Sequence, residues 1–432
     1  MFETLRNVWK IEELRKKVLY TVFMLILYRL LCVVPVPGVD LASVQEGLET
    51  FSLLQFMNSI TGSNLQMYTI MAMGISPYIN ASIIMQLLTV AIPKLEEMNK
   101  SGEEGRKKIA QITRYVTVAL GFLQAVALTS AIGAQASGGT FGLITIGFCM
   151  AAGTALAMWI GERITENGIG NGISLLIFAG IISNFANQIA VGAYNAWHMP
   201  SYLLIALPVL IISLVLIVAV TCVDLAERRV PVQYAKRVVG RKMYGGQSTV
   251  IPIRIAGGGV MPLIFAFALI SFPGMLASLF WPGSAFEQGV TEWFSGSGTW
   301  YGQLIYMVVL CLLIFAFAFF YSSMQFNPED VSKTIQQNGG FIQGIRPGKP
   351  TADYLKKISN RITLFGAIYL SLVALIPSIL GIIASVVLGM TDTSLLSVFS
   401  TTGILIVVSV ALELDKQLQS QLMMKNYKGF LK

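Results

Sequence analysis

The sequence predicts an all-α protein that crosses a membrane ten times, and three observations support this fold class. The 432-residue chain is 55% hydrophobic and only 12% charged, with a mean hydropathy of +0.69, whereas soluble proteins carry roughly 25% charged residues. Its apolar residues gather in long runs, each close to the roughly 20 residues that a helical crossing needs. Basic residues lie in alternate connections between these runs, and this pattern sets the number of crossings.

Ten apolar runs are expected to form the crossings. They are Val18–Val36, Gly74–Ile92, Tyr115–Ile132, Leu143–Ile160, Ile173–Ala190, Tyr202–Val223, Val260–Phe280, Leu304–Tyr321, Ile362–Leu380 and Leu396–Leu412. Of the 30 Lys and Arg residues, all except Arg29 fall at the termini or in the connections after even-numbered crossings. Because basic residues stay on the cytoplasmic side of a membrane, both termini and these connections are expected to face the cytoplasm.

Two inverted halves of five crossings each follow from this count, if the halves are structural repeats. The expected halves are residues 1–195 and 196–432. Inverted repeats place the working site at their interface, where Gly and Pro interrupt helices at matching positions. The second crossing contains Gly74 and Pro77, and the seventh, its counterpart, contains Pro273. This match favours a site between the halves.

Two basic connections, residues 224–259 and 327–361, are longer than orientation requires. Val230, Val232 and Tyr234 alternate with other residues as in a β-strand. If the basic residues served only to orient the chain in the membrane, the sign of their charge would be explained, but the length of two loops of about 35 residues would not. Loops of that length are usually functional. We therefore favour docking of a large cytoplasmic partner over mere orientation.

The sequence offers no set of residues for catalysis or for holding a cofactor or metal. The only histidine, His198, has no neighbouring carboxylate, and the four cysteines form no Cys-x-x-Cys pair. Gly348-Lys349 fails as a phosphate-binding loop, because Gln343 occupies the first Gly position and Pro350 follows the Lys. Any energy for transport is expected to come from a partner.

Arg29 is the one charged residue expected at membrane depth. At about 1.5 Å per helical residue, it lies roughly 18 Å beyond Lys17. Inserting such a charge costs around 2.5–3.5 kcal/mol, which predicts a carbonyl or water partner inside the bundle. The predicted crossings contain no Asp or Glu. This counts against the alternative function, an ion-coupled transporter of small solutes, which would need acids at that depth.

Seven segments carry motifs that occur together in one known family. They are Pro35–Asp40, Gly74–Leu88, Gly102–Tyr115, Thr165–Ser174, Tyr234–Thr249, Phe326–Pro328 and Gly344–Gly348. On these motifs the chain resembles the SecY family of protein-conducting channel subunits over nearly its whole length. The resemblance implies a central pore for unfolded polypeptides between the two halves. It also implies a lateral gate into lipid, between the second and third crossings and the seventh and eighth.

The resemblance further implies that a ring of apolar side chains seals the middle of the pore. Matched position by position, this isoleucine ring consists of Ile75, Ile79, Ile177, Ile181, Ile264 and Ile406. A narrow apolar ring expels water and blocks ions. Isoleucine is common in membrane helices, so only the family pattern selects these six.

A plug helix near residues 58–66 and polar residues in the gate are implied as well. The plug residues are Ser59, Thr61, Gly62, Ser63, Asn64 and Leu65, and the polar gate residues are Asn80 and Gln124. Ala256 stands where the family usually has Asn, which leaves the polar contact at that end of the gate in doubt.

The implied partners are the small membrane subunits SecE and SecG, the SecA motor ATPase, the ribosome, and the signal sequences and unfolded chains that pass through. Lys236, Arg237, Arg241, Lys242 and Arg346 would contact SecA or ribosomal RNA, whose phosphates suit basic loops. The chain itself is expected to be a passive channel in the bacterial cytoplasmic membrane and not an enzyme.

Overall fold

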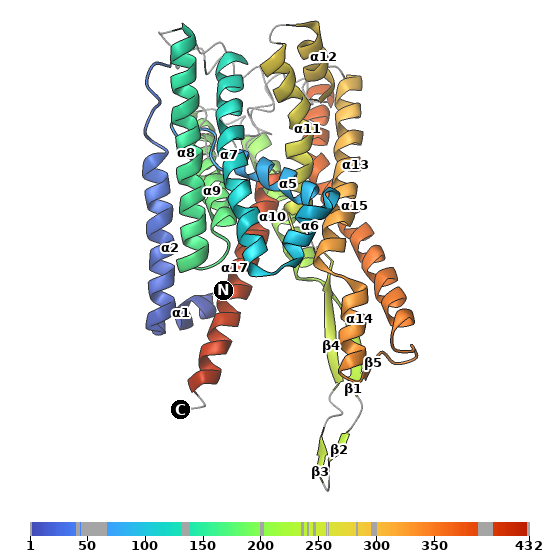
Figure 1. The fold of residues 1–432 in the computed structure, drawn as a ribbon. Coiled ribbons are helices and arrows are strands. Elements are labelled where there is room, and N and C mark those ends of the chain that lie inside the picture. The colour runs from blue at the N-terminus through green and yellow to red at the C-terminus, as the bar shows by residue number, and fades with distance from the viewer. Residues whose placement is uncertain are drawn as a thin grey trace.

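The computed structural model is a bundle of long helices with a small β-structure projecting from one end (Figure 1). It describes residues 2–39, 44, 67–131, 139–198, 203–234, 237–239, 242–244, 248–255, 257, 259–281, 284–294, 300–387 and 401–429. Each predicted crossing overlaps a helix. These helices are α2 (Glu12–Leu31), α5 (Ser76–Ala91), α7 (Glu103–Ala131), α8 (Gly139–Asn167), α9 (Gly172–His198), α10 (Leu203–Leu225), α11 (Met261–Phe280), α13 (Trp300–Gln325), α15 (Lys349–Val387) and α17 (Thr401–Gly429). Shorter helices are α1 (Phe2–Lys10), α6 (Pro93–Lys100), α12 (Ala285–Phe294) and α14 (Pro328–Gln337).

Several of these helices have the length and composition of membrane crossings. Within the described residues, four segments qualify alone: Glu103–Ser130, Gly139–Asn167, Tyr301–Gln337 and Lys349–Ile376. Helices α5 and α6 qualify only as a pair, bent by 100°. Shorter apolar helices cover Gly172–Ala186, Ile211–Leu225 and Met261–Gly274. The chain is therefore a multi-pass membrane protein, and the total of ten crossings stays a prediction.

The second crossing starts two residues later than the sequence predicts. Gly74 lies in a turn, Ile75 caps the helix, and Pro77 occupies the first turn of α5. Proline is tolerated there because the first N–H groups of a helix have no intrahelical partner. Gly74 and Pro77 thus define the start of α5 and do not interrupt it. Helix α11 likewise continues past Pro273 to Phe280.

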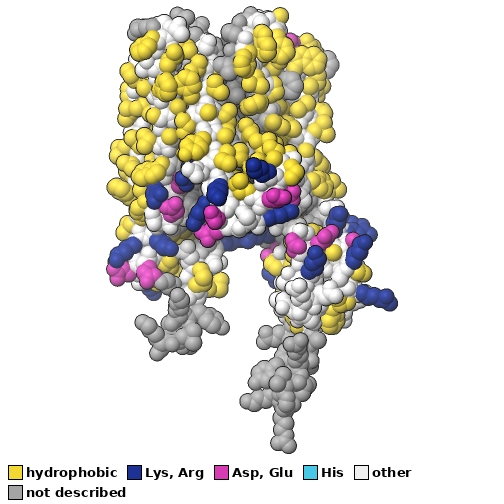
Figure 2. Space-filling model, in the orientation of Figure 1, with side chains coloured by type: hydrophobic (Ala, Val, Ile, Leu, Met, Phe, Trp, Pro, Cys, Tyr) yellow, Lys and Arg dark blue, Asp and Glu magenta, His cyan; other side chains and the backbone are white. Residues whose placement is uncertain are grey.

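Charged side chains gather at one end of the molecule. On the face drawn in Figure 2, an apolar belt covers the upper helices, and nearly all of the blue and magenta side chains lie below it. Both described chain ends and the β-structure lie at this charged end (Figure 1). The distribution agrees with the sidedness of basic residues in the sequence, and the side that faces the cytoplasm stays a prediction.

The β-structure at the charged end confirms the expected strand. Strand β1 (Glu227–Tyr234) lies between β4 (Ser248–Arg254) and β5 (Gly340–Phe341), antiparallel to both. Val230 and Val232 are buried on one face of β1, as their alternation predicts. A separate hairpin of β2 (Arg237–Val239) and β3 (Lys242–Tyr244) extends beyond this sheet (Figure 1).

The second long connection is mostly helical. Helix α14 and the first turns of α15 pack with the sheet around a small core of Val230, Val232, Ile253, Ile335, Ile342 and Leu355. Helix α15 begins at Lys349, well before the predicted crossing at Ile362. Hydropathy detects only the apolar part of such a helix. We call strands β1–β5, helix α14 and residues 340–358 the projection.

Candidate functional site

The six predicted ring isoleucines lie in one apolar cluster. Ile75, Ile177, Ile181 and Ile406 expose 7% or less of their surface, and Ile79 and Ile264 pack against them half-buried. They come from α5 and its cap, α9, α11 and α17, so both halves of the chain contribute. The cluster contains many other apolar residues of the bundle. The structure brings the six into the same core, and their function as a seal stays a prediction.

Helix α9 carries two of the six, and its start is fixed by the motif at residues 165–174. The Asn171 side-chain oxygen accepts from the N–H of Ile173 at 3.0 Å and from that of Ser174 at 3.4 Å, an N-terminal cap. A Cβ on Gly172 would lie 1.9 Å from the carbonyl oxygen of Gly161 on α8. Only glycine therefore permits this approach of α9 to α8. The motif sets the position from which α9 enters the core.

Helix α2 holds α9 at two heights. Near the charged end, the N–H of Ile169, just before α9, donates to Oγ1 of Thr21 at 3.1 Å. Farther along, the Arg29 guanidinium donates to the carbonyl oxygen of Ala179 within α9. The sequence predicted a carbonyl or water partner for Arg29, and this contact confirms the carbonyl. The identity of Ala179 could not be predicted, because the two residues are far apart in the chain.

The helices that carry the predicted gate residues pack against a helix of the second half. Helix α11 packs against both α7 and α5. Asn80 on α5 is half-buried, and Gln124 on α7 exposes 4% of its surface. Among the described residues, the Gln124 side-chain oxygen has no hydrogen-bond partner, which is costly in an apolar setting.

One further polar contact near the gate was not predicted. The Gln86 side-chain amide on α5 donates to the Ser82 hydroxyl, one turn earlier on the same helix, at 3.4 Å. Phe265 on α11 packs edge-on against Tyr321 on α13, with ring centroids 5.5 Å apart. Polar residues four apart among the apolar residues of α5 were a visible signal in the sequence, because residues at this spacing are neighbours on a helix.

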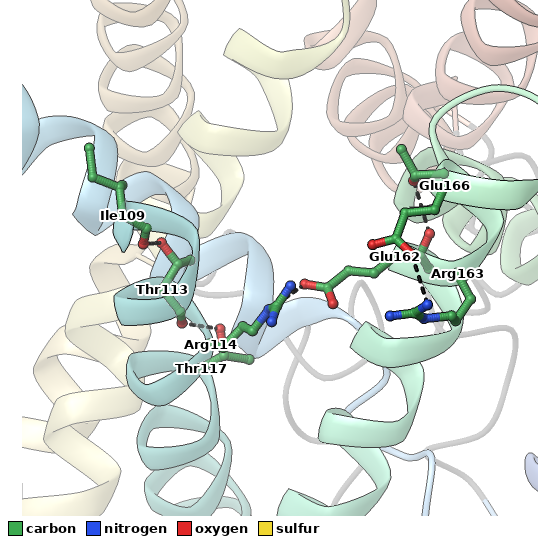
Figure 3. Close-up of polar contacts among 9 residues, drawn as sticks. Ile109, Thr113, Arg114, Thr117, Glu162, Arg163 and Glu166 are labelled. Carbon is green, nitrogen blue, oxygen red and sulfur yellow. Dashed lines mark hydrogen bonds and ion pairs between the residues drawn. The ribbon is translucent and has the colours of Figure 1, made fainter. Parts of the chain in front are cut away.

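The first half has its own polar contacts at the charged end. Figure 3 shows Arg114 on α7 and Glu162 on α8 pointing toward each other, and their side chains form an ion pair at 2.8 Å. One turn apart within α7, the Thr113 hydroxyl donates to the Ile109 carbonyl at 2.9 Å (Figure 3). The ion pair joins α7 to α8 and the Thr113 bond lies within α7, so neither contact involves the predicted gate partner α11.

Among the predicted docking residues, Arg346 has the best-defined setting. Gly344 and Gly348 flank it with φ of +83° and +94°, a conformation that favours glycine. The Thr351 hydroxyl donates to the Arg346 carbonyl at 2.8 Å, and the Ser332 hydroxyl donates to the Gly348 carbonyl at 2.7 Å. The loop backbone is thus fixed to α14 and α15, and the Arg346 side chain is exposed.

The other predicted site residues are less fully described. The backbone of Arg237 and Lys242 belongs to the outer hairpin, where Arg237 pairs with Tyr244 and Lys242 pairs with Val239. Lys236, Arg241, Ala256 and the plug residues Ser59, Thr61, Gly62, Ser63, Asn64 and Leu65 lie outside the described residues. The described part of the chain contains no group of three or more His, Cys, Asp or Glu that could hold a metal ion.

Comparison with known proteins decides the family. A model of the SecY family matches residues 69–414. The chain belongs to the SecY family. The SecY subunit of the protein translocase of Streptomyces galbus is 40% identical over 449 residues, with all of both chains covered. The family resemblance that the sequence indicated is therefore confirmed.

Solved channels share the SecY fold with this chain. A structure of a protein-conducting channel superposes with a TM-score of 0.67 at 19% identity, covering 94% of this chain and 92% of its own. Sec61 in the canine ribosome–channel complex of the endoplasmic reticulum gives a TM-score of 0.63 at 18% identity, with the same coverage of both chains. At these identities the likeness establishes the fold alone.

Proposed function

We propose that this SecY-family chain is the channel subunit that passes unfolded secretory polypeptides across the bacterial cytoplasmic membrane. One observation carries the proposal most: isoleucines from four segments of both halves meet in a single apolar core. Such a core blocks water and ions when closed. Its uncharged side chains make no strong contact with a polypeptide that passes between them.

The same chain would release apolar segments sideways into lipid. Helices α5 and α7 of the first half would separate from α11 and α13 of the second, with Asn80 and Gln124 at the contact. A signal segment of about 7–15 apolar residues gains roughly 0.3–0.6 kcal/mol per Leu, Ile, Phe or Val on entering lipid. The total of several kcal/mol would drive the segment through the open gate. Residues 58–66 would act as the plug on the external side.

Partners would supply the driving force at the charged end. We infer that SecA and the ribosome dock on the projection, through Arg346 and the basic hairpin residues Lys236, Arg237, Arg241 and Lys242. SecE and SecG would complete the membrane complex. This assignment places both termini and the projection in the cytoplasm, as the distribution of basic residues favours. In this proposal the chain itself catalyses no reaction.

Reconstitution with purified SecA, SecE and SecG tests the proposal. Vesicles that contain the chain should take up an unfolded polypeptide with a signal sequence, in an ATP-dependent manner. Arg346→Glu should abolish this uptake, because a carboxylate would repel an acidic docking surface. Lys10→Glu on α1, another exposed residue but one outside the projection, should leave uptake close to that of the wild type.

Two results would contradict the proposal. If Arg346→Glu supports uptake at the wild-type rate, the loop is not the docking site. If vesicles with the wild-type chain alone accumulate a small labelled solute and take up no polypeptide, the chain is a secondary transporter, the alternative that the sequence left open.

A further inference from the structure

Arg29 contacts α9 at the level of the isoleucine ring. Its guanidinium donates to the carbonyl oxygen of Ala179, which lies two residues after Ile177 and two before Ile181. Residues two apart on a helix point to nearly opposite sides, whereas residues four apart share a face. Arg29 therefore holds α9 from behind, while Ile177 and Ile181 face the apolar core together.

Ordinary structural roles do not account for this arginine. A cation in the last turn of a helix can interact with that helix's own carbonyl groups, but the Arg29 guanidinium reaches a carbonyl on a different helix. Attachment of α2 to α9 already exists lower down, through Thr21 and the N–H of Ile169. Tyr28, Met24 and Cys32 on α2 also pack into the shared core. An apolar residue at position 29 would preserve this packing without placing a charge at membrane depth.

A hydrogen bond fixes the position of α9 along the axis of α2, which apolar packing alone does not. Apolar contacts are non-directional, so α9 could slide or rotate slightly against α2 with little loss of burial. A charge-assisted hydrogen bond tolerates only a few tenths of an ångström and a limited range of angles. The acceptor is a backbone atom, so the bond fixes the helix axis and not a single side chain.

We propose that Arg29 is a positioning residue for the isoleucine ring. It fixes the height and rotation of α9, so that Ile177 and Ile181 stay level with Ile75 on the α5 side and Ile406 on α17. The inference rests on the proposed function, because it assigns Arg29 a part in the resting seal. It goes beyond that function by placing a seal determinant on α2, outside the four segments that form the ring.

Ion leak through the resting channel tests the inference. Arg29→Met keeps most of the apolar stem and removes the donors. In vesicles that hold the complete complex without SecA, this variant should leak ions several-fold faster than the wild type. Arg29→Lys keeps a charged donor and should leak close to the wild-type rate. Thr21→Val, which removes the lower contact, should leave the leak unchanged, since it lies away from the ring.

A double variant distinguishes positioning of the ring from a general loss of stability of the helix bundle. If Arg29 acts through the ring, Arg29→Met and Ile181→Gly should not have additive effects on the leak. The inference is overturned if Arg29→Met leaks no faster than the wild type, or if Arg29→Lys leaks as fast as Arg29→Met. It is also overturned if Thr21→Val leaks as fast as Arg29→Met, or if the effects of Arg29→Met and Ile181→Gly on the leak are additive. If Arg29→Met is not recovered as folded protein, Arg29→Gln is judged by the same criteria.

The experiment distinguishes this inference from the proposed function. Uptake of a signal-bearing polypeptide is measured in the same vesicles after SecA and ATP are added. If the wild type takes up the polypeptide and Arg29→Met leaks no faster than the wild type, only the role of Arg29 is refuted. Absence of wild-type uptake refutes the channel function itself, whatever the leak measurements give.

Discussion

The isoleucine ring and the projection are built by different means. Burial and shape hold the ring residues in an apolar core, to which Arg29 on α2 adds a polar contact with the backbone of α9. The projection has a small apolar core, and it adds paired strands and a loop fixed by side-chain hydrogen bonds to its backbone. The ring therefore depends on the volume and polarity of side chains, and the docking loop depends on backbone geometry.

The largest expected effect comes from removing volume at the ring. Ile79→Gly combined with Ile406→Gly should raise resting ion conductance about tenfold or more, because a wider or wetted constriction no longer excludes ions. Conductance in planar bilayers is the measurement. The matched control, Ile79→Leu with Ile406→Leu, conserves volume and apolarity and should conduct like the wild type. A leak in the control comparable to the Gly variant would show that shape, and not apolar volume, forms the seal.

A medium effect is expected from a cavity in the projection. Leu355 is fully buried against the strand residues Val230 and Val232. Leu355→Ala should destabilise the projection by about 2–5 kcal/mol and make it sensitive to limited proteolysis. SecA-dependent uptake should fall, while resting conductance stays at the wild-type level. A simultaneous rise in conductance would mean that the two regions are mechanically coupled.

The same contrast explains what the sequence could predict. Strand β1 was predicted because alternation of Val230 and Val232 with exposed residues is a local pattern. The ring could not be selected from physics, because many apolar residues share its core and nothing local distinguishes Ile264 from them. Family resemblance was needed for those six positions. The structure then brings them together without testing their role.

The sequence predicted helix α15 and the partner of Arg29 only in part, because local sequence patterns do not contain the missing information. The extension of α15 to Lys349 escaped prediction, because hydropathy marks only the stretch that suits a membrane. The partner type of Arg29 was predictable from the cost of burying a charge. The partner itself depends on how α2 packs against α9, and that information is not local to either helix.

The smallest effect should come from backbone strain in the docking loop. Gly344 has φ of +83°, and a Cβ there would meet nothing within 4 Å. Gly344→Ala therefore adds strain without a clash, and the left-handed conformation costs roughly 1–2 kcal/mol. The N–H of Ile345, which donates to the Ile342 carbonyl at 3.0 Å, should exchange its hydrogen faster. SecA affinity should weaken modestly, because Arg346 would be less well positioned.

Gly289→Ala on α12 provides the control for this prediction. The added Cβ also meets nothing within 4 Å, and no left-handed backbone is involved. In a helix interior the change should stabilise α12 by about 0.5–1 kcal/mol. It should leave SecA affinity unchanged, since α12 lies at the end of the bundle opposite the projection (Figure 1). Equal effects of the two variants on exchange at Ile345 would show that the loop does not depend on its backbone conformation.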